Sequence, residues 1–238
     1  MEGWWIGVSN AIAGGMMIAA SCSLCYEGVT FSDDLPSSLS ASASASSPLF
    51  GLFRTSLGVL SGLLFIVATK AFLHKYEDLK AGGLLAGGAD ARRVLLIVFV
   101  MIMHSFSEGV GIGVSFGGAS GGKLGLFISL SLAVHNVPEG LAVALVLLPK
   151  RLRIGTVALW CVVTSLPQPL MAVPAFMFVE HFMPLLPVGL GFAGGAMFFV
   201  AVCELLVEAA EETGNKTAGL VAAASFVAMI IVQNSIKE

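Results

Sequence analysis

Seven long apolar runs divide this chain, and each is about as long as a membrane-spanning helix. About 20 apolar residues in a helix are enough to cross the hydrocarbon core of a bilayer. Charged residues make up only 11% of the 238 residues, whereas an ordinary soluble domain has about 25%. The sequence therefore predicts an all-α, polytopic membrane helix bundle. We expect its seven transmembrane helices at 4–26, 50–73, 94–116, 124–148, 155–179, 186–208 and 217–236.

The domain organisation follows from the polar stretches between these runs. We expect a single transmembrane domain over residues 1–238, with a Ser/Ala-rich extracytoplasmic linker at 31–49. A second polar connection, 74–93, contains lysines, arginines and glycines but a single histidine, so it is expected to be a solvated loop. The N-terminus lacks the positive charges of a signal peptide, which predicts that none is cleaved.

Positive charges are distributed unevenly over the predicted loops, and this asymmetry predicts the orientation. The positive-inside rule places loops 74–93, 149–154 and 209–216 in the cytoplasm. The N-terminus is then cytoplasmic and the C-terminus outside. Lys70, near the end of its span, is expected to extend toward the same cytoplasmic side. The charges of that side are Lys75, Lys80, Arg92, Arg93, Lys150, Arg151, Arg153 and Lys216, against Arg54, Lys123 and Lys237 on the other.

One short pattern of ionisable residues occurs in two consecutive spans. His104 is followed four residues later by Glu108, His135 is followed by Glu139 at the same spacing, and a glycine follows each glutamate. Residues four apart lie on the same face of a helix. Ionisable side chains inside a bilayer are costly and mark ion pathways. The doubled pattern therefore predicts a metal site within the membrane.

The depth of these residues can be estimated from the helical rise of about 1.5 Å per residue. His104 then lies about 15 Å from the cytoplasmic end of its helix, and His135 about 18 Å from the outer end of the next. Gln168 lies about 20 Å into the following span. Since the hydrocarbon core is about 30 Å thick, we expect all three residues close to the midplane.

The ligand types predict which ions the site would bind. Imidazole and carboxylate groups suit borderline divalent cations such as Zn²⁺, Fe²⁺ or Mn²⁺. Two helices can together supply the four ligands of a tetrahedral site. Without metal, at least one of the two carboxylates is expected to be protonated, which would couple metal binding to proton release. The predicted metal ligands are His104, Glu108, His135 and Glu139.

Prolines at the same depth predict local breaks in two of the helices. Pro138 lacks a backbone N–H and is expected to free the carbonyl of Val134, beside His135. Pro167 and Pro169 are expected to do the same around Gln168. Freed carbonyls are tolerated at membrane depth where they line a cavity, and broken helices at the midplane are typical of transporter binding sites.

Five further polar residues are candidates for secondary or pathway roles. Ser105 and Asn136 directly follow the two histidines, so they point off the main ligand face and could reach a second ion. Gln168 is equally compatible with a structural role and a pathway role. Glu204 and Glu208, one turn apart near a cytoplasmic helix end, form either an inner exit site or part of the interfacial surface.

Small residues in the apolar runs have simpler explanations. Gly109, Gly111 and Gly113, and the pair Gly191 and Gly195, are expected to permit close packing of helices. The cysteines are Cys22, Cys25, Cys161 and Cys203. The first two have CxxC spacing, which can indicate redox chemistry or a soft metal site, but no second CxxC exists, and we interpret them as buried thiols.

Several of these motifs resemble those of one transporter family. Residues 135–140, HNVPEG, resemble the HNxPEG helix of the ZIP family (Zrt-, Irt-like proteins) of divalent metal transporters, and its GufA-like branch in particular. Residues 104–109 are similar to the preceding family helix, residues 10–17 with Glu27 to the second, and residues 191–208 to the seventh. The resemblance covers nearly the whole chain.

The resemblance implies an eight-helix transporter that moves metal into the cytoplasm by an elevator-like motion, with both termini outside. It implies the same four main ligands, bordered by Asn136 and Gln168, with Glu204 toward the inner exit. The family's first helix has no counterpart here, in agreement with seven predicted spans. Gln168 stands where the family usually has Glu, and Ser105 where it usually has Asn, which favours one ion per site.

Taken together, the sequence predicts transmembrane transport of divalent metal ions, zinc first and iron or manganese as alternatives. The expected partners are the ion and the lipid bilayer, with a homodimer left open, and the chain has no basic patch for nucleic acid. An intramembrane zinc-dependent hydrolase is the first alternative, although it needs an open coordination position and the chain has no HExxH motif. A non-transporting metal-binding membrane protein or sensor is the second alternative. We do not expect an enzyme.

Overall fold

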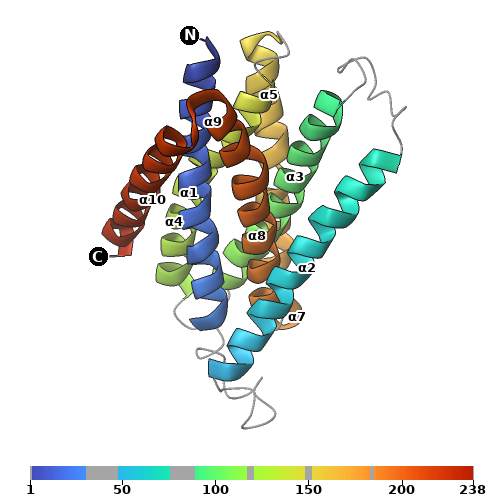
Figure 1. The fold of residues 1–238 in the computed structure, drawn as a ribbon. Helices are drawn as coiled ribbons and strands as arrows, with labels where there is room; N and C mark the ends of the chain where they lie inside the picture. The colour runs from blue at the N-terminus through green and yellow to red at the C-terminus, as the bar shows by residue number, and fades with distance from the viewer. Residues whose placement is uncertain are drawn as a thin grey trace.

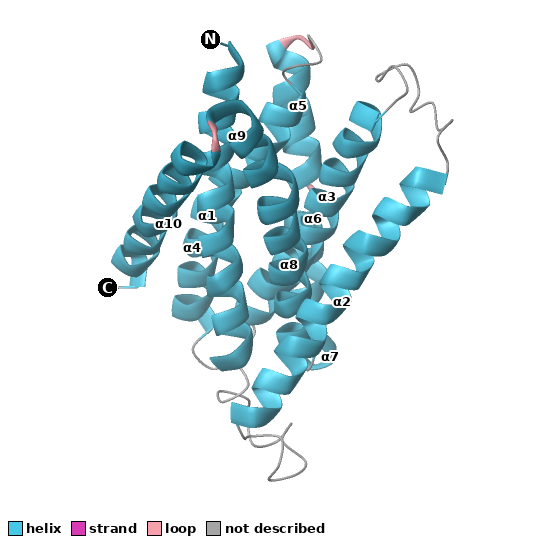
Figure 2. Cartoon of the chain, in the orientation of Figure 1, coloured by secondary structure: helices cyan, strands magenta, loops and turns pink. Residues whose placement is uncertain are grey.

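The computed structural model describes residues 2–30, 48–75, 89–116, 121–147, 152–182 and 185–237 as a bundle of helices (Figure 1). Figure 2 shows no strand in these ranges, which confirms the predicted all-α class. The helices are α1 (Glu2–Thr30), α2 (Pro48–Lys75), α3 (Ala89–Phe116), α4 (Gly121–Leu147), α5 (Ile154–Ser165), α6 (Pro167–Met177), α7 (Val179–Phe182), α8 (Leu186–Val200), α9 (Leu206–Thr213) and α10 (Asn215–Lys237).

The described helices include six that are long and apolar enough to cross a membrane. The remaining predicted span, 124–148, corresponds to α4, whose apolar part, Leu132–Leu147, is shorter. A bilayer also explains why α2 exposes large apolar side chains such as Leu57, Leu60 and Leu64, at 50%, 58% and 68%. The six spans are Gly3–Thr30, Leu49–Ala71, Ile97–Phe116, Ile154–Met177, Leu186–Thr213 and Asn215–Ser235.

The two predicted polar connections fall largely outside the described residues. Their edges are helical, however, because α2 begins at Pro48 and ends at Lys75, and α3 begins at Ala89. The helices therefore extend further into the predicted linker 31–49 and the predicted loop 74–93 than the hydropathy pattern indicated.

The predicted proline break is confirmed around Gln168, whereas Pro138 does not end its helix. At Leu166 the chain passes from α5 to α6, directly before Pro167, and the Leu166 N–H donates to the carbonyl of Val163 at 3.3 Å. In contrast, α4 stays helical through Pro138, so it is not broken there. A single proline removes one donor, and a long helix held by its neighbours can accommodate that loss.

A second irregularity lies between α8 and α9, where residues Ala201–Leu205 form one π-helical turn. The N–H of Leu206 donates to the carbonyl of Ala201, five residues earlier. Such wide turns are rare in proteins and occur often at functional sites. This turn includes Glu204, one of the predicted pathway residues.

Glycines let α2 and α8 pack with their backbones in contact. A Cβ atom added at Gly191 would lie 2.2 Å from the carbonyl oxygen of Thr55, and one at Gly195 would lie 2.6 Å from that of Val59. On the α2 side, a Cβ atom at Gly58 would lie 2.2 Å from the carbonyl oxygen of Val188. The predicted close packing at Gly191 and Gly195 is therefore confirmed, and it is reciprocal.

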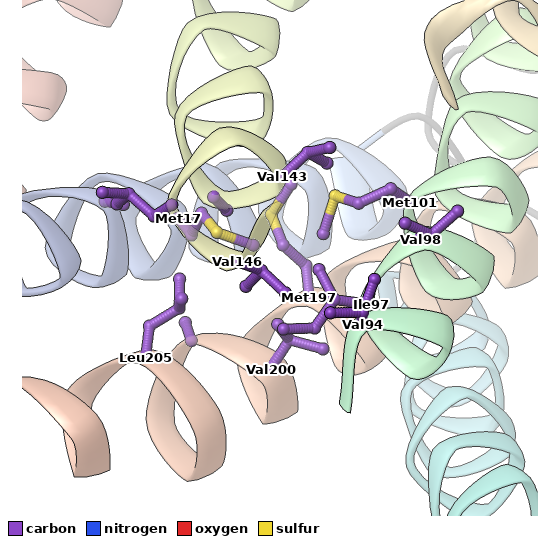
Figure 3. Packing of buried hydrophobic residues seen from close by; sticks show 14 of the residues in the cluster. Met17, Val94, Ile97, Val98, Met101, Val143, Val146, Met197, Val200 and Leu205 are labelled. Carbon is purple, nitrogen blue, oxygen red and sulfur yellow. The ribbon is translucent and has the colours of Figure 1, made fainter. Parts of the chain in front are cut away.

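The main apolar core lies where α1, α3, α4 and α8 meet, and Figure 3 shows its side chains. Met17 of α1, Met101 of α3 and Met197 of α8 lie close around Val143 of α4, and all four are at most 1% exposed. Val143 and Met101 lie about one turn from the two motif positions Glu139 and His104 on their helices. The core therefore fixes the relative positions of the helices that carry the predicted site.

We predict that Gly191→Ala destabilises the protein, because the added methyl group would collide with backbone rather than with a movable side chain. Overpacking of this kind costs about 1–3 kcal/mol. Gly189→Ala is the matched control, because a Cβ atom there meets nothing within 4 Å. Thermal unfolding of detergent-solubilised protein should show a lower midpoint for Gly191→Ala alone. Equal midpoints for the two variants would contradict the backbone contact.

Candidate metal centre

Three of the four predicted ligands meet between α3 and α4. His104 and Glu108 stand one turn apart on α3, and Glu139 extends from α4. The His104 Nε2 atom lies 2.7 Å from Glu139 Oε1 and 3.2 Å from Glu108 Oε1. One ligand atom from each residue falls within 4.8 Å of the others. The helical spacing of the motif and the crossing of the two helices thus create one cluster.

The cluster is buried and electrostatically incomplete. His104, Glu108 and Glu139 are 1%, 0% and 4% exposed. Apart from the contacts between His104 Nε2 and the two carboxylates, no hydrogen bond among the described residues satisfies Nδ1 of His104 or Oε2 of Glu108. Buried polar groups are almost always partnered, and two carboxylates in a medium of low dielectric need positive charge beside them. A divalent cation would supply both the charge and the missing contacts.

The fourth predicted ligand, His135, belongs to α4, one turn before Glu139. Its side chain lies outside the part of the structure that is described. The four-ligand set therefore stays a prediction, and the described geometry concerns the other three residues.

An amide pair ties α6 to α4 beside this cluster. The Asn136 Nδ2 atom donates to Gln168 Oε1 at 2.8 Å. Gln168 is 8% exposed, and Asn136 Oδ1 has no hydrogen bond among the described residues. Because Asn136 directly follows His135 in the chain, this contact places Gln168 beside the motif segment of α4. This hydrogen bond anchors α4 at Asn136, which lies less than one helical turn from Glu139.

The backbone of Gln168 also touches α3. A Cβ atom at Gly109 would lie 2.2 Å from the Gln168 carbonyl oxygen, and one at Gly113 would lie 2.2 Å from the carbonyl oxygen of Ala172. The predicted close packing is confirmed at both positions. It is wrong for Gly111, which faces Leu186 at an ordinary distance of 3.7 Å. Gln168 thus contacts both motif helices, α4 through its side chain and α3 through its backbone.

The remaining candidate residues have separate surroundings. Ser105 is 2% exposed on α3, and nothing in its described surroundings assigns it a second ion. Glu204 pairs with Lys70 of α2, whose Nζ atom lies 2.5 Å from Glu204 Oε1. Glu208 accepts a hydrogen bond of 2.8 Å from Asn10 Nδ2 of α1. Within the described residues, neither glutamate joins the cluster of His104.

Two of these partners were not found from the sequence. Lys70 was expected to extend toward the cytoplasmic side, and the structure adds that it contacts a carboxylate 134 positions away. Asn10, 1% exposed, is an amide within an apolar run. A polar residue in an apolar run is noticeable in the sequence, so Asn10 could have been singled out. Its position alone does not reveal that its partner is Glu208.

The four cysteines are free, as predicted. The Cys161 Sγ atom lies 3.5 Å from the carbonyl oxygen of Gly140, where it donates a weak hydrogen bond from α5 to α4. Cys22 is exposed on the surface of α1 that we expect to face lipid, and Cys25 is half-buried. The interpretation of the CxxC pair as buried thiols is therefore wrong for Cys22, and Cys25 is only partly buried.

An imidazole buried between two carboxylates in a bundle of apolar helices is typical of membrane proteins that bind or transport cations. Comparison with known proteins identifies the family within this class. A family model described as "ZIP Zinc transporter" matches residues 74–233, and the chain belongs to the ZIP family.

Similar proteins include three whose names refer to zinc transport. A putative zinc transporter of Arabidopsis thaliana is 38% identical over 225 residues, which cover 94% of this chain and 33% of the relative. The zinc transporter GufA of Myxococcus xanthus is 32% identical over 65% of this chain and 60% of its own length. The zinc transporter ZIPB of Bordetella bronchiseptica is 33% identical over 68% and 52%. The chain thus spans between about one third and three fifths of the length of these relatives.

We predict that Gly109→Ala weakens metal binding, because the added methyl group would push α3 away from Gln168 and shift Glu108 next to it. Displacing a charged group that contacts the ion should cost about tenfold in affinity or more. Gly140→Ala is the matched control, because Gly140 follows the other motif glutamate and a Cβ atom there meets nothing within 4 Å. Zn²⁺ titration calorimetry of both variants checks this prediction. A Gly109→Ala variant that binds like the control would contradict it.

Proposed function

We propose that this protein transports divalent metal ions across a membrane, with Zn²⁺ as its main substrate. The observation that carries the proposal is the buried cluster of His104, Glu108 and Glu139, whose ligand atoms lie within 4.8 Å of one another and contact only each other among the described residues. The names of the three relatives support zinc as the substrate. Fe²⁺ and Mn²⁺ suit the same donor set and are secondary candidates.

In this proposal each ligand replaces part of the hydration shell of the ion. The imidazole nitrogens of His104 and His135 and the carboxylates of Glu108 and Glu139 complete a tetrahedral site. Asn136 and Gln168 border the site and keep α4 in place through their hydrogen bond. Glu204 and Glu208 lie further along the route. One ion per site fits the neutral amides of Asn136 and Gln168, which offer less negative charge than carboxylates would.

Transport toward the cytoplasm is proposed from the charge distribution. Among the described residues, Lys75, Arg153 and Lys216 belong to the predicted loops with most of the positive charge, and such charges favour the cytoplasmic side. Glu204 and Glu208 belong to the same end of the bundle, where α9 lies beside the start of α1 (Figure 1). A cation released from the midplane would therefore meet these carboxylates on its way to the cytoplasm.

Transport accounts for the donor set better than hydrolysis does. A catalytic zinc keeps an open position for an activated water molecule and needs a separate base. Here both described carboxylates contact the same imidazole nitrogen, so both are positioned as ligands. A protein that binds metal without transporting it would use the same ligands, and only a measurement of flux separates that alternative from a transporter.

We predict that His104→Ala and Glu139→Gln each abolish Zn²⁺ uptake by proteoliposomes and lower Zn²⁺ affinity by about 100-fold or more. The magnitude follows because removing one partner of a buried charged group costs about 3–5 kcal/mol, and about 1.4 kcal/mol is tenfold in affinity. Glu211→Gln on the exposed surface of α9 is the control and should behave like the wild type.

The proposal is rejected when either variant retains wild-type uptake and affinity. Wild-type protein that binds Zn²⁺ in calorimetry but shows no flux would instead support the non-transporting alternative. Parallel uptake of Fe²⁺ and Mn²⁺ establishes the order of preference among the three ions.

A further inference from the structure

The ion pair between Lys70 and Glu204 joins α2 to the π-helical turn between α8 and α9. Lys70 Nζ lies 2.5 Å from Glu204 Oε1 and 5.3 Å from the ring centroid of Phe199. The two residues are 134 positions apart in sequence. The pair therefore depends on the packing of α2 against α8, which the glycine contacts hold in place.

The two partners differ in their access to water. The Lys70 side chain is 46% exposed, whereas that of Glu204 is only 12% exposed. A carboxylate within an apolar span needs a positive partner, because an uncompensated buried charge is strongly destabilising. The ammonium group, in contrast, sits on a flexible stem and can move into water at little cost. Lys70 can therefore leave this pair, and a cation can take its place beside Glu204.

The surroundings of Glu204 favour such an exchange. It lies in a π-helical turn, where the backbone is wider than in an α-helix. One turn further along, Glu208 is held by Asn10, whose Oδ1 atom is buried and has no hydrogen bond among the described residues. Divalent cations bind oxygen ligands such as the carboxylates and amides of these side chains. Lys70 is therefore in direct competition with a divalent cation that reaches this end of the bundle.

We propose that Lys70 is an exchangeable counter-ion of Glu204, which a divalent cation displaces on its passage and which returns when the cation leaves. This inference rests on the proposed transport function. When the cation is abundant at this site its double charge displaces the ammonium group, and when the local cation concentration falls the tethered ammonium group returns. Lys70 thus prevents Glu204 from retaining the cation, and it keeps the carboxylate compensated between transport cycles.

The direct test measures the reactivity of the Lys70 amine in the wild-type protein. Detergent-solubilised protein is acylated at increasing Zn²⁺ or Mn²⁺, and modification of each lysine is followed by mass spectrometry. Displacement from Glu204 should raise the acylation rate of Lys70 by about fivefold, as expected for the loss of a partly exposed ion pair. Lys216, which is exposed at the start of α10, is the internal control and should not respond.

Variants of the pair complete the test. In Glu204→Gln, Lys70 should react rapidly at all cation concentrations. In proteoliposomes, Lys70→Arg should slow uptake, because a guanidinium group binds a carboxylate more firmly through two hydrogen bonds. Two results would contradict the proposed exchange. One is a Lys70 acylation rate in the wild type that does not change with cation concentration, and the other is a rate in Glu204→Gln that still does.

The outcome is separable from that of the proposed function. Wild-type uptake without any response of Lys70 removes the exchange and leaves transport standing. A cation-dependent change in Lys70 acylation without any uptake rejects transport. The cation then displaces Lys70 by binding at equilibrium, without crossing the membrane.

Discussion

The main physical constraint on this protein is the burial of two carboxylates and one imidazole inside an apolar helix bundle. His104, Glu108 and Glu139 are at most 4% exposed, and their contacts with one another do not satisfy their polar atoms. An apolar cluster that includes methionines and valines packs α1, α3, α4 and α8 against one another (Figure 3). In such surroundings a divalent cation is the partner that removes most of the electrostatic penalty. The helices, their packing and their irregular turns can be understood from this requirement.

Small residues and prolines place the ligands with little freedom. Gly109 lets α3 approach the backbone of α6, and Pro167 begins α6 at the position that presents Gln168 to both neighbours. The hydrogen bond from Asn136 then fixes α4. Close backbone packing at glycines also occurs between α2 and α8, at Gly58 and Gly191, away from the cluster. Close backbone contact in a bilayer replaces the hydrophobic driving force that soluble bundles use.

Much of this arrangement could be predicted from periodicity, and the failures also have physical reasons. The spacing of His104 and Glu108 determines that they share a helix face, and hydropathy locates the spans. Gly111 was wrongly grouped with Gly109 because residues two apart point to opposite sides of a helix. The partners of Glu204 and Glu208 were missed because contacts of α2 with the π-helical turn, and of α1 with α9, leave no local pattern in the sequence. The loops at 31–47 and 76–88 lie outside the described residues, and so does the side chain of His135.

The central claim is that ligands from α3 and α4 replace the hydration shell of a divalent cation. X-ray absorption spectroscopy of the zinc-loaded protein tests this claim most directly, with His104→Ala as the comparison. The account predicts a first shell of nitrogen and oxygen only, at about 2.0–2.2 Å, with less imidazole scattering in the variant. A shell with sulfur at about 2.3 Å, or a spectrum that His104→Ala leaves unchanged, would contradict it.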